Sequence, residues 1–477
     1  MNTKLTKIIA TIGPVTESED MIERLIVAGV NIFRFNFKHS SVEWHSERIQ
    51  RVHKVAEKLG VIVGILVDLQ GPEIRILLPD DQMDLKKGEL LLLGPEALEK
   101  KEKGFSITHP DVIKHLKEGQ KLLADDGYFV FHVVKKDGKT YLRSEQDLLM
   151  KSRKTLNIPG ADFPFPVLVD RDFEGLQLAA RNNVDFVGLS FVRTASDLRT
   201  MKEEMQKYGV KALAVAKIET QKALDNLDEI IEECDAVMIA RGDLGVEQPL
   251  EQVPFYQKIL IKKCIETGKP VITATQMLQS MITQPMATRA EVSDIANATY
   301  DLTDSVMLSG ETASGSYPFE AVEMMARTAS FNERQFMMDN RYRFEYELND
   351  EGSLICDTAY SLFLQCDELD KDVKAFVVYS HTGKTARMLS RYRPLIPIFA
   401  ITPEKHVAES LTISFGVTPF VHREIANGKV TQEHIQKTLE DLRMKEYIAT
   451  GDKVIVLHGD VWSIEGGTST VKIVTTP

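Results

Sequence analysis

The sequence predicts an α/β protein: a (β/α)8 TIM barrel with a small β-barrel lid domain inserted after the third strand, followed by a C-terminal α/β domain. Three observations support this fold class. Short apolar, β-rich runs alternate with helical patterns until eight strands are reached. Between Pro72 and Asn157 the pattern changes to short strand-like runs broken by turns. After Gln335 a second, shorter α/β pattern begins.

The predicted boundaries are residues 1–71 and 158–335 for the barrel, 72–157 for the insertion and 340–477 for the terminal domain. The helical patterns Ser18–Ala28 and Val42–Leu59 are typical of those that separate the strands. The predicted barrel strands are Lys7–Gly13, Ile32–Phe37, Gly64–Leu69, Asp185–Val192, Ala214–Glu219, Ala236–Gly242, Pro270–Met277 and Asp304–Gly310.

The predicted strands of the other two domains are shorter and fewer. In the insertion they are Glu89–Leu93, Lys121–Leu123, Tyr128–Val134 and Thr140–Arg143, with turns at 125–127 and 136–138. In the terminal domain they are Ala375–Ser380, Ile396–Ile401 and Lys453–Leu457.

Composition excludes several classes of partner. The 58 basic and 70 acidic residues leave a formal charge of −12, so no overall field attracts nucleic acid or anionic lipid, and only a local basic patch stays open. The four cysteines form no CxxC pair and no zinc-ligand cluster, which fits a reducing cytoplasm. We expect no signal peptide and no membrane helix, because no stretch approaches about 20 apolar residues.

Charged and polar residues follow the predicted barrel strands, at the end where barrel enzymes carry their active sites. A ring of ordinary salt bridges would explain one of them, but so many at corresponding ends indicate a site. They are Arg34, Asn36 and Lys38; Asp68, Glu73 and Arg75; Lys217 and Glu219; Arg241, Gly242 and Asp243; Thr273 and Thr275; and Ser309 and Glu311.

The chemistry of these groups indicates metal-assisted reaction of a small anion. Glu219 and Asp243 end adjacent strands, and two close carboxylates repel each other unless a cation joins them. Oxygen ligands favour Mg²⁺ or Mn²⁺. Lys217 lies two residues before Glu219 and suits a developing enolate oxygen. Arg34 and Arg75 suit a phosphate clamp.

Eight stretches of the sequence together resemble the pyruvate kinase family. They occur in order along almost the whole chain: IIATIGP, FRFNF, VDLQGPEIR, VAKIET, ARGDLGVE, TATQMLQSM, TRAEVSDIANA and DSVMLSGETASGSYP. Each motif alone is modest, but eight in the right order are specific. The resemblance implies transfer of phosphate from phosphoenolpyruvate to ADP, giving pyruvate and ATP, the final step of glycolysis.

The resemblance also implies roles for individual residues. Glu219 and Asp243 would hold the divalent metal, and Lys217 would stabilise the phosphoryl group and the enolate oxygen. Arg34 would steer the phosphate. Gly242, Asp243 and Thr275 would bind the substrate carboxylate. Protonation of enolpyruvate would involve Thr275 or a water relay near Ser309 and Glu311.

The nucleotide would lie beneath the inserted lid, which excludes water when it closes. Its predicted contacts are Arg75, Asn36 and His39. Asp126, in the DDG turn, is a candidate for contact with the nucleotide-bound metal; the equally simple alternative is a hairpin-turn residue.

One position departs from the family pattern. The family builds a monovalent-cation site from an Asn, a Ser two residues later, and an Asp with the following carbonyl; here these positions are Asn36, Lys38, Asp68 and Leu69. The Lys38 ammonium would occupy the place of K⁺ and relax the need for it. Alternatively, Lys38 swings out to a surface acid and leaves a weakened K⁺ site. Glu73 is the residue type of potassium-dependent members, so the two signals conflict.

The terminal domain carries a loop that resembles the family's effector-phosphate loop. GKT at 383–385 is not a P-loop, because Val378 stands where that motif needs Gly. The predicted effector contacts are Ser380, Thr382, Gly383, Lys384, Thr385, Gly467 and Thr468. A sugar bisphosphate, a sugar monophosphate and AMP all fit, and an inherited loop without a ligand is the alternative.

Two other functions stay open at this stage. A metal-dependent lyase or aldolase acting on pyruvate-type enolates also uses barrels with Glu/Asp metal pairs, but it needs no nucleotide lid. A non-catalytic or weakly active metabolite-sensing paralogue would explain Lys38, yet Lys217, Glu219, Asp243 and Thr275 are intact. The resemblance further implies a homotetramer under allosteric control.

Overall fold

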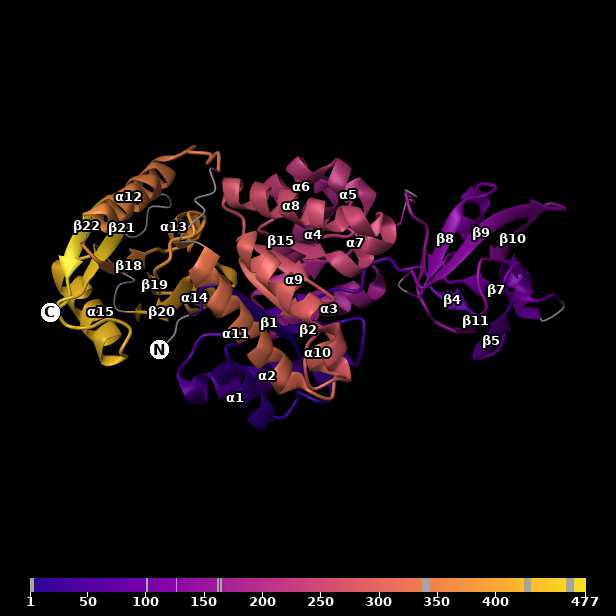
Figure 1. The fold of residues 1–477 in the computed structure, drawn as a ribbon, viewed down its shortest axis with the longest axis horizontal. Helices are drawn as coiled ribbons and strands as arrows, with labels where there is room; N and C mark the ends of the chain where they lie inside the picture. The colour runs from indigo at the N-terminus through magenta and orange to yellow at the C-terminus, as the bar shows by residue number, and fades with distance from the viewer. Residues whose placement is uncertain are drawn as a thin grey trace.

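Three units follow one another along the longest axis of the molecule, with the barrel in the centre, the insertion at one end and the C-terminal unit at the other (Figure 1). The computed structural model describes residues 4–99, 102–125, 127–160, 163, 165–336, 344–369, 371–423, 430–459 and 467–477. Within these residues no helix has both the length and the apolar character needed to span a membrane.

The central unit is a closed barrel of eight parallel strands, which confirms the predicted fold class. Its pairing order is β1-β2-β3-β13-β14-β15-β16-β17, and β17 pairs with β1. The strands are β1 Lys7–Thr11, β2 Ile32–Asn36, β3 Gly64–Asp68, β13 Phe186–Leu189, β14 Leu213–Ile218, β15 Ala236–Ala240, β16 Val271–Ala274 and β17 Ser305–Leu308.

Helices surround this barrel. The sequence directs their ends locally: Ser18 and Ser41 accept backbone N–H bonds at the starts of α1 and α2, and Gly29 and Gly60 end these helices in the left-handed conformation. The helices are α1 Glu19–Ala28, α2 Val42–Leu59, α3 Asp170–Arg181, α4 Ala195–Tyr208, α5 Gln221–Asp225, α6 Leu227–Glu233, α7 Arg241–Glu247, η3 Leu250–Gln252, α8 Val253–Thr267, η4 Gln279–Ile282, α9 Arg289–Tyr300, α10 Gly310–Ala313 and α11 Pro318–Phe336.

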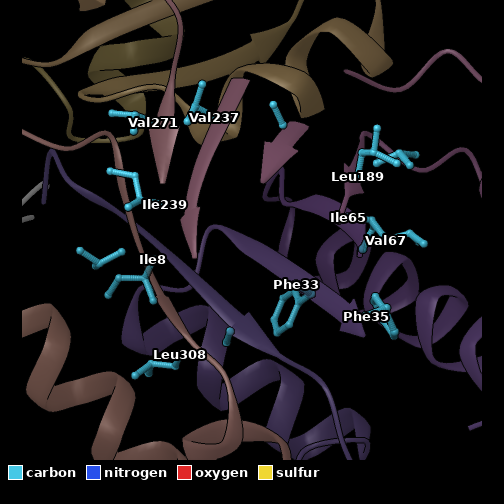
Figure 2. Packing of buried hydrophobic residues seen from close by; sticks show 14 of the residues in the cluster. Ile8, Phe33, Phe35, Ile65, Val67, Leu189, Val237, Ile239, Val271 and Leu308 are labelled. Carbon is cyan, nitrogen blue, oxygen red and sulfur yellow. The ribbon is translucent and has the colours of Figure 1, made fainter. Parts of the chain in front are cut away.

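Side chains along the barrel strands alternate between two apolar clusters. One set packs against the surrounding helices; it includes Ile8, Phe33, Ile65 and Ile239 (Figure 2). The other set fills the barrel interior, and its members include Ile32, Leu66 and Val215. Two residues further along the same three strands come Arg34, Asp68 and Lys217. Alternation therefore places these three charged side chains on the interior face, at the C-terminal end of the barrel.

The insertion is a seven-stranded sheet with a two-stranded ribbon beside it. The sheet order is β12-β8-β9-β10-β6-β7-β4, and an isolated bridge between Arg75 and Thr155 joins its two ends, so the sheet curls back onto itself as a small barrel does. The elements are β4 Ile76–Leu77, β5 Gln82–Leu85, β6 Leu90–Leu93, η1 Pro95–Glu99, β7 Gly104–Ile107, η2 Pro110–His115, β8 Lys121–Ala124, β9 Phe129–Lys136, β10 Lys139–Ser144, β11 Leu148–Lys151 and β12 Leu156–Asn157.

The C-terminal unit is a five-stranded sheet in the order β20-β19-β18-β21-β22, in which β22 is antiparallel to its neighbour. Strands β20 and β22 are additions to the sequence prediction. The elements are α12 Glu351–Glu368, β18 Val373–Tyr379, α13 Lys384–Ser390, β19 Ile398–Thr402, α14 Lys405–Ser410, η5 Leu411–Ile413, β20 Val417–Val421, α15 Gln432–Met444, β21 Lys453–Gly459 and β22 Thr468–Thr475.

This unit also closes the N-terminal end of the barrel. Ile413 belongs to the apolar cluster of the barrel interior. Arg393 Nη2 donates to Asp304 Oδ2 at 2.6 Å, and both side chains are buried. Lys7 Nζ donates to the Val417 carbonyl at 2.8 Å. The charged residues at the C-terminal strand ends therefore lie at the opposite mouth of the barrel.

Candidate active site

Four charged side chains form a buried cluster at this mouth. Arg34 donates from Nε and Nη2 to Asp68 Oδ2 at 2.9 and 2.5 Å. Lys217 Nζ lies 3.1 Å from Asp68 Oδ1 and 3.0 Å from Glu219 Oε1. The exposed fractions of Arg34, Asp68, Lys217 and Glu219 are 8, 1, 9 and 1%. Ions so deeply buried are stable only as partners of one another.

The cluster fixes the charge of its members. Burial alone would raise the pKa of Asp68, but Lys217 and Arg34 outweigh it and hold that pKa below its usual value. Burial alone would lower the pKa of Lys217, but Asp68, Glu219 and Asp243 together raise it above its usual value. Lys217 is therefore a permanent cation, and Asp243 lies near enough to act on it.

A glycine leaves room for the cluster. Gly188, on β13, sits beside Asp68 in the sheet register. A Cβ added there would lie 3.3 Å from Asp68 Oδ1 and 3.7 Å from Lys217 Cδ. The close approach of this ion pair to the strand therefore depends on the missing side chain at position 188.

Three further residues that the sequence analysis did not select hold the cluster in place. The Ser190 hydroxyl accepts from Lys217 Nζ at 2.7 Å and donates to the Leu69 carbonyl at 2.8 Å. Thr11 Oγ1 accepts from Arg34 Nη1 at 3.0 Å. The Phe191 backbone N–H donates to Glu219 Oε2 at 2.6 Å. A serine ending an apolar strand was a usable signal for Ser190, whereas a backbone donor leaves no trace in the sequence.

The donor set suits a hard divalent cation. Glu219 and Asp243 present carboxylates near Lys217, and Asp243 lines a cavity of about 340 Å³ together with Glu73 and Glu247. The described residues contain no group of three or more His, Cys, Asp and Glu arranged to hold a metal. Mg²⁺ is commonly held by one or two carboxylates, with the remaining ligands from substrate and water. The two carboxylates therefore fit such an ion without a complete protein cage.

The substrate-side residues after β16 and β15 bond to each other. Thr275 has a φ of 66°, a left-handed conformation that is strained for a β-branched residue and is typical of functional sites. Its hydroxyl accepts from the Gly242 N–H at 2.7 Å and donates to the Ala274 carbonyl at 2.6 Å. The Gly242 N–H, which the resemblance assigns to substrate, thus has a protein acceptor in this structure.

Ser309 and Glu311, the two predicted site residues in the turn after β17, differ in their hydrogen bonding. Both oxygens of the buried Glu311 carboxylate accept backbone N–H bonds, from Leu278 at 3.1 Å and from Ser309 at 2.8 Å. The Ser309 hydroxyl is buried and has no hydrogen-bond partner among the described residues. Glu311 therefore shapes the turn, and the Ser309 hydroxyl lies buried at the end of β17.

Lys38 bonds an acid inside the site and not one at the surface. Its ammonium bonds Glu73 Oε1 at 2.5 Å, and Arg75 bonds the other oxygen at 2.6 Å. Glu73 is not a surface acid: its side chain is 10% exposed, and it lines the cavity that holds Asp243. The expected swing to a surface acid is replaced by an ion pair at the edge of the site. His39 follows on the exposed side of this turn.

Comparison with known proteins assigns this arrangement to a family. The models of the pyruvate kinase barrel domain and the pyruvate kinase alpha/beta domain match residues 3–322 and 358–474. The chain belongs to the pyruvate kinase family. Pyruvate kinases of two Staphylococcus aureus strains, MRSA252 and USA300, are each 40% identical over 480 residues, spanning 98% of this chain and 80% of each relative. A crystal structure of a pyruvate kinase from Cryptosporidium parvum matches with a TM-score of 0.89 and 31% identity, over 99% of this chain and 96% of that one.

Membership of the pyruvate kinase family confirms that the chain is an enzyme, a phosphotransferase, and confirms the predicted catalytic function. The roles of single residues rest on the geometry above. Asp126 lies outside the described residues, so its predicted contact has no structural counterpart.

The predicted effector residues come together in the terminal domain. Thr385 and Thr468 share a hydroxyl–hydroxyl bond of 2.7 Å, which joins the two loops that the resemblance pairs. Lys384 is bonded to Asp350 at 2.6 Å. Ser380 is buried, Thr382 and Gly383 form the turn before α13, and Gly467 adjoins residues 460–466, which lie outside the described residues.

Glu247 connects the barrel to the segment that returns from the insertion. Its Oε2 accepts from the Gly160 N–H at 3.2 Å. Burial raises the pKa of Glu247 to about 7. The folded state therefore binds a proton more tightly than the unfolded state does, so stability falls as pH rises from the unfolded pKa toward 7.

We predict that Glu247→Gln removes this loss. As pH rises from about 5 to about 8, wild type should lose about 2–3 kcal/mol of stability relative to the variant. Thermal midpoints measured across that range test this, with Glu251→Gln, an exposed acid beside α8, as the matched control. Parallel curves for wild type and Glu247→Gln would contradict the prediction.

Proposed function

We propose that the cluster at the barrel mouth carries out phosphoryl transfer from phosphoenolpyruvate to ADP. The strongest support is the buried charge of Lys217. Asp68 and Glu219 keep this lysine cationic, and it lies near the carboxylates of Glu219 and Asp243. Phosphoryl transfer needs positioning and charge neutralisation more than covalent chemistry from the protein. A fixed ammonium in a site of low dielectric meets that need.

Each side chain has a role that follows from its contacts. Arg34 donates three N–H groups to Asp68 and Thr11. These bonds orient the rest of its guanidinium for a phosphate. Lys217 stabilises the negative charge that develops on the enolate oxygen. A divalent metal bound by Glu219 and Asp243 would neutralise phosphate and enolate charge. Ser309 and Thr275 are the candidates for delivering the proton that converts enolpyruvate to pyruvate.

The insertion acts as the lid in this proposal. A Cβ on Gly127, the last residue of its DDG turn, would lie 3.6 Å from Val246 Cγ2 on α7, so the insertion already reaches the barrel mouth. Nucleotide would bind between them, near Arg75, Asn36 and His39, and lid closure would exclude water from the transfer step.

The activity is tested by pyruvate formation from phosphoenolpyruvate, ADP and Mg²⁺. We expect turnover by wild type and a loss of about 10³-fold or more in Lys217→Met, because this change removes the cation held beside the Glu219 and Asp243 carboxylates. Lys207→Met, which removes an exposed lysine on α4, is the matched control and should keep full activity. Absence of turnover in wild type would favour the non-catalytic paralogue instead.

We also propose that this enzyme does not need K⁺. The oxygens of the family's monovalent site already have protein donors. Asn36 Oδ1 accepts from the Lys38 N–H at 3.3 Å, Asp68 is paired with Arg34 and Lys217, and the Leu69 carbonyl accepts from Ser190. Lys38 and Arg75 neutralise Glu73. The residues present therefore fit an internal ammonium better than a bound K⁺.

We predict equal turnover of wild type with K⁺ and with a large inert cation as counterion. Lys38→Ser, which restores the residue type of the family site, should become dependent on K⁺, with at least about tenfold stimulation. Lys54→Ser, a change of an exposed lysine on α2, controls for loss of charge. A saturable K⁺ requirement in wild type would refute the proposal.

The wider properties implied by the family are proposals as well. We infer a homotetramer. Two exposed apolar side chains support it: Leu250, just before α8, and Phe255, on α8. We infer control by a phosphorylated effector at the loop that joins Thr385 to Thr468. A cytoplasmic location is supported by four free, buried cysteines.

A further inference from the structure

The first turn of α3 contacts both of the turns that bring Lys38 to Glu73. Lys38 lies in the turn between β2 and α2, and Glu73 lies in the segment that follows β3. Arg171 and Asp172 are neighbours in the first turn of α3, and each contacts one of these turns. Arg171 donates to backbone carbonyls, whereas Asp172 accepts from backbone N–H groups. The start of α3 therefore determines how the two turns meet.

Arg171 holds the turn between β2 and α2 at two points. Its Nε donates to the Phe37 carbonyl at 3.1 Å, and its Nη2 donates to the Ser40 carbonyl at 2.6 Å. The guanidinium also lies 4.1 Å from the centroid of the Phe37 ring, and its Nη1 donates to Glu174 at 2.5 Å. A planar guanidinium fixes two acceptors in one orientation, whereas an ammonium acts as a point charge. Lys38 lies between the two held carbonyls in the sequence.

The turn is strained at Ser40. Its φ of 62° lies in the left-handed region, which is unfavourable for residues other than glycine, and its side chain is exposed. Two contacts hold this conformation from outside the turn. One is the bond from Arg171 to the Ser40 carbonyl, and the other joins Nε2 of the buried His45 to the His39 carbonyl at 2.7 Å. Loss of the Arg171 bonds would therefore allow the turn to relax.

Asp172 holds the segment that follows β3. Its Oδ1 accepts from the Gln70 N–H at 2.8 Å and from the Gly71 N–H at 3.3 Å, and its side chain is buried. Glu73 comes two residues after Gly71. This contact fixes the segment to the same helix start that holds the other turn. The ion pair between Lys38 and Glu73 forms where the two held segments meet.

We propose that Arg171 is a positioning residue for the nucleotide site. Its two carbonyl bonds hold the turn between β2 and α2 in the conformation that directs Lys38 to Glu73 and places His39 at the edge of the site. His39 lies near enough to Glu73 and Arg75 for their charges to act on it. The inference rests on the proposed function, in which ADP binds beside this turn.

The test compares wild type with Arg171→Lys, which keeps the charge and loses the planar fork. We expect the KM for ADP, and its Kd by calorimetry, to rise at least about fivefold, while the KM for phosphoenolpyruvate changes less than about twofold. The variant should also gain at least about threefold stimulation by K⁺, because Lys38 no longer stays on Glu73. Arg199→Lys, a change of an exposed arginine that pairs with Glu233, is the matched control and should behave as wild type.

Ser40→Gly supplies a rescue that a purely structural role would not show. Glycine adopts a φ near 62° without strain, so adding Ser40→Gly to Arg171→Lys should return the KM for ADP to within about twofold of wild type. If Arg171→Lys does not fold, Arg171→Met takes its place, because methionine keeps an apolar contact with the Phe37 ring and lacks the N–H donors.

Three results would overturn the proposal. The first is an ADP affinity that does not differ between wild type and Arg171→Lys, absence of binding to both included. The second is an equal loss for both substrates with every counterion, which leaves a structural role alone. The third is no rescue by Ser40→Gly. Absence of turnover in wild type would contradict the proposed function instead, and calorimetric binding of ADP would then decide the role of Arg171.

Discussion

The structure depends on keeping four charges buried at one mouth of the barrel. Arg34, Asp68 and Lys217 each lie two residues beyond an apolar residue of the barrel interior, and Glu219 pairs with Lys217. Removing ions from water is unfavourable unless each finds a partner, so the cluster is a constraint on its surroundings as well as a site. Gly188 leaves room beside Asp68, and Ser190 and Thr11 supply hydroxyls to Lys217 and Arg34.

The rest of the fold supplies the rigidity that this cluster needs. The C-terminal unit closes the far end of the barrel through the buried Arg393–Asp304 pair and Ile413, so the strands that carry the charges are fixed at both ends.

Much of the fold and site followed from patterns of residues. Alternation in short apolar strands predicted the barrel, and charges at strand ends predicted Arg34, Asp68, Lys217 and Glu219. Contacts between distant segments could not be predicted in this way. Nothing in the sequence indicates that Lys38 pairs with Glu73, 35 residues away, or that the Gly242 N–H donates to the Thr275 hydroxyl. Strand β22 was missed because it is an edge strand: only Thr468 is fully buried, and the exposed positions are Ser469, Ile473 and Thr475, so it lacks the apolar run of a central strand.

We propose that Asp68 keeps Lys217 charged for catalysis. The most direct measurement is the pH dependence of turnover in Asp68→Asn and wild type, followed by the loss of phosphoenolpyruvate absorbance up to about pH 10. We expect a flat alkaline limb in wild type and an earlier alkaline fall in Asp68→Asn, because loss of one anion lowers the pKa of Lys217. Identical alkaline limbs in the two proteins would contradict it.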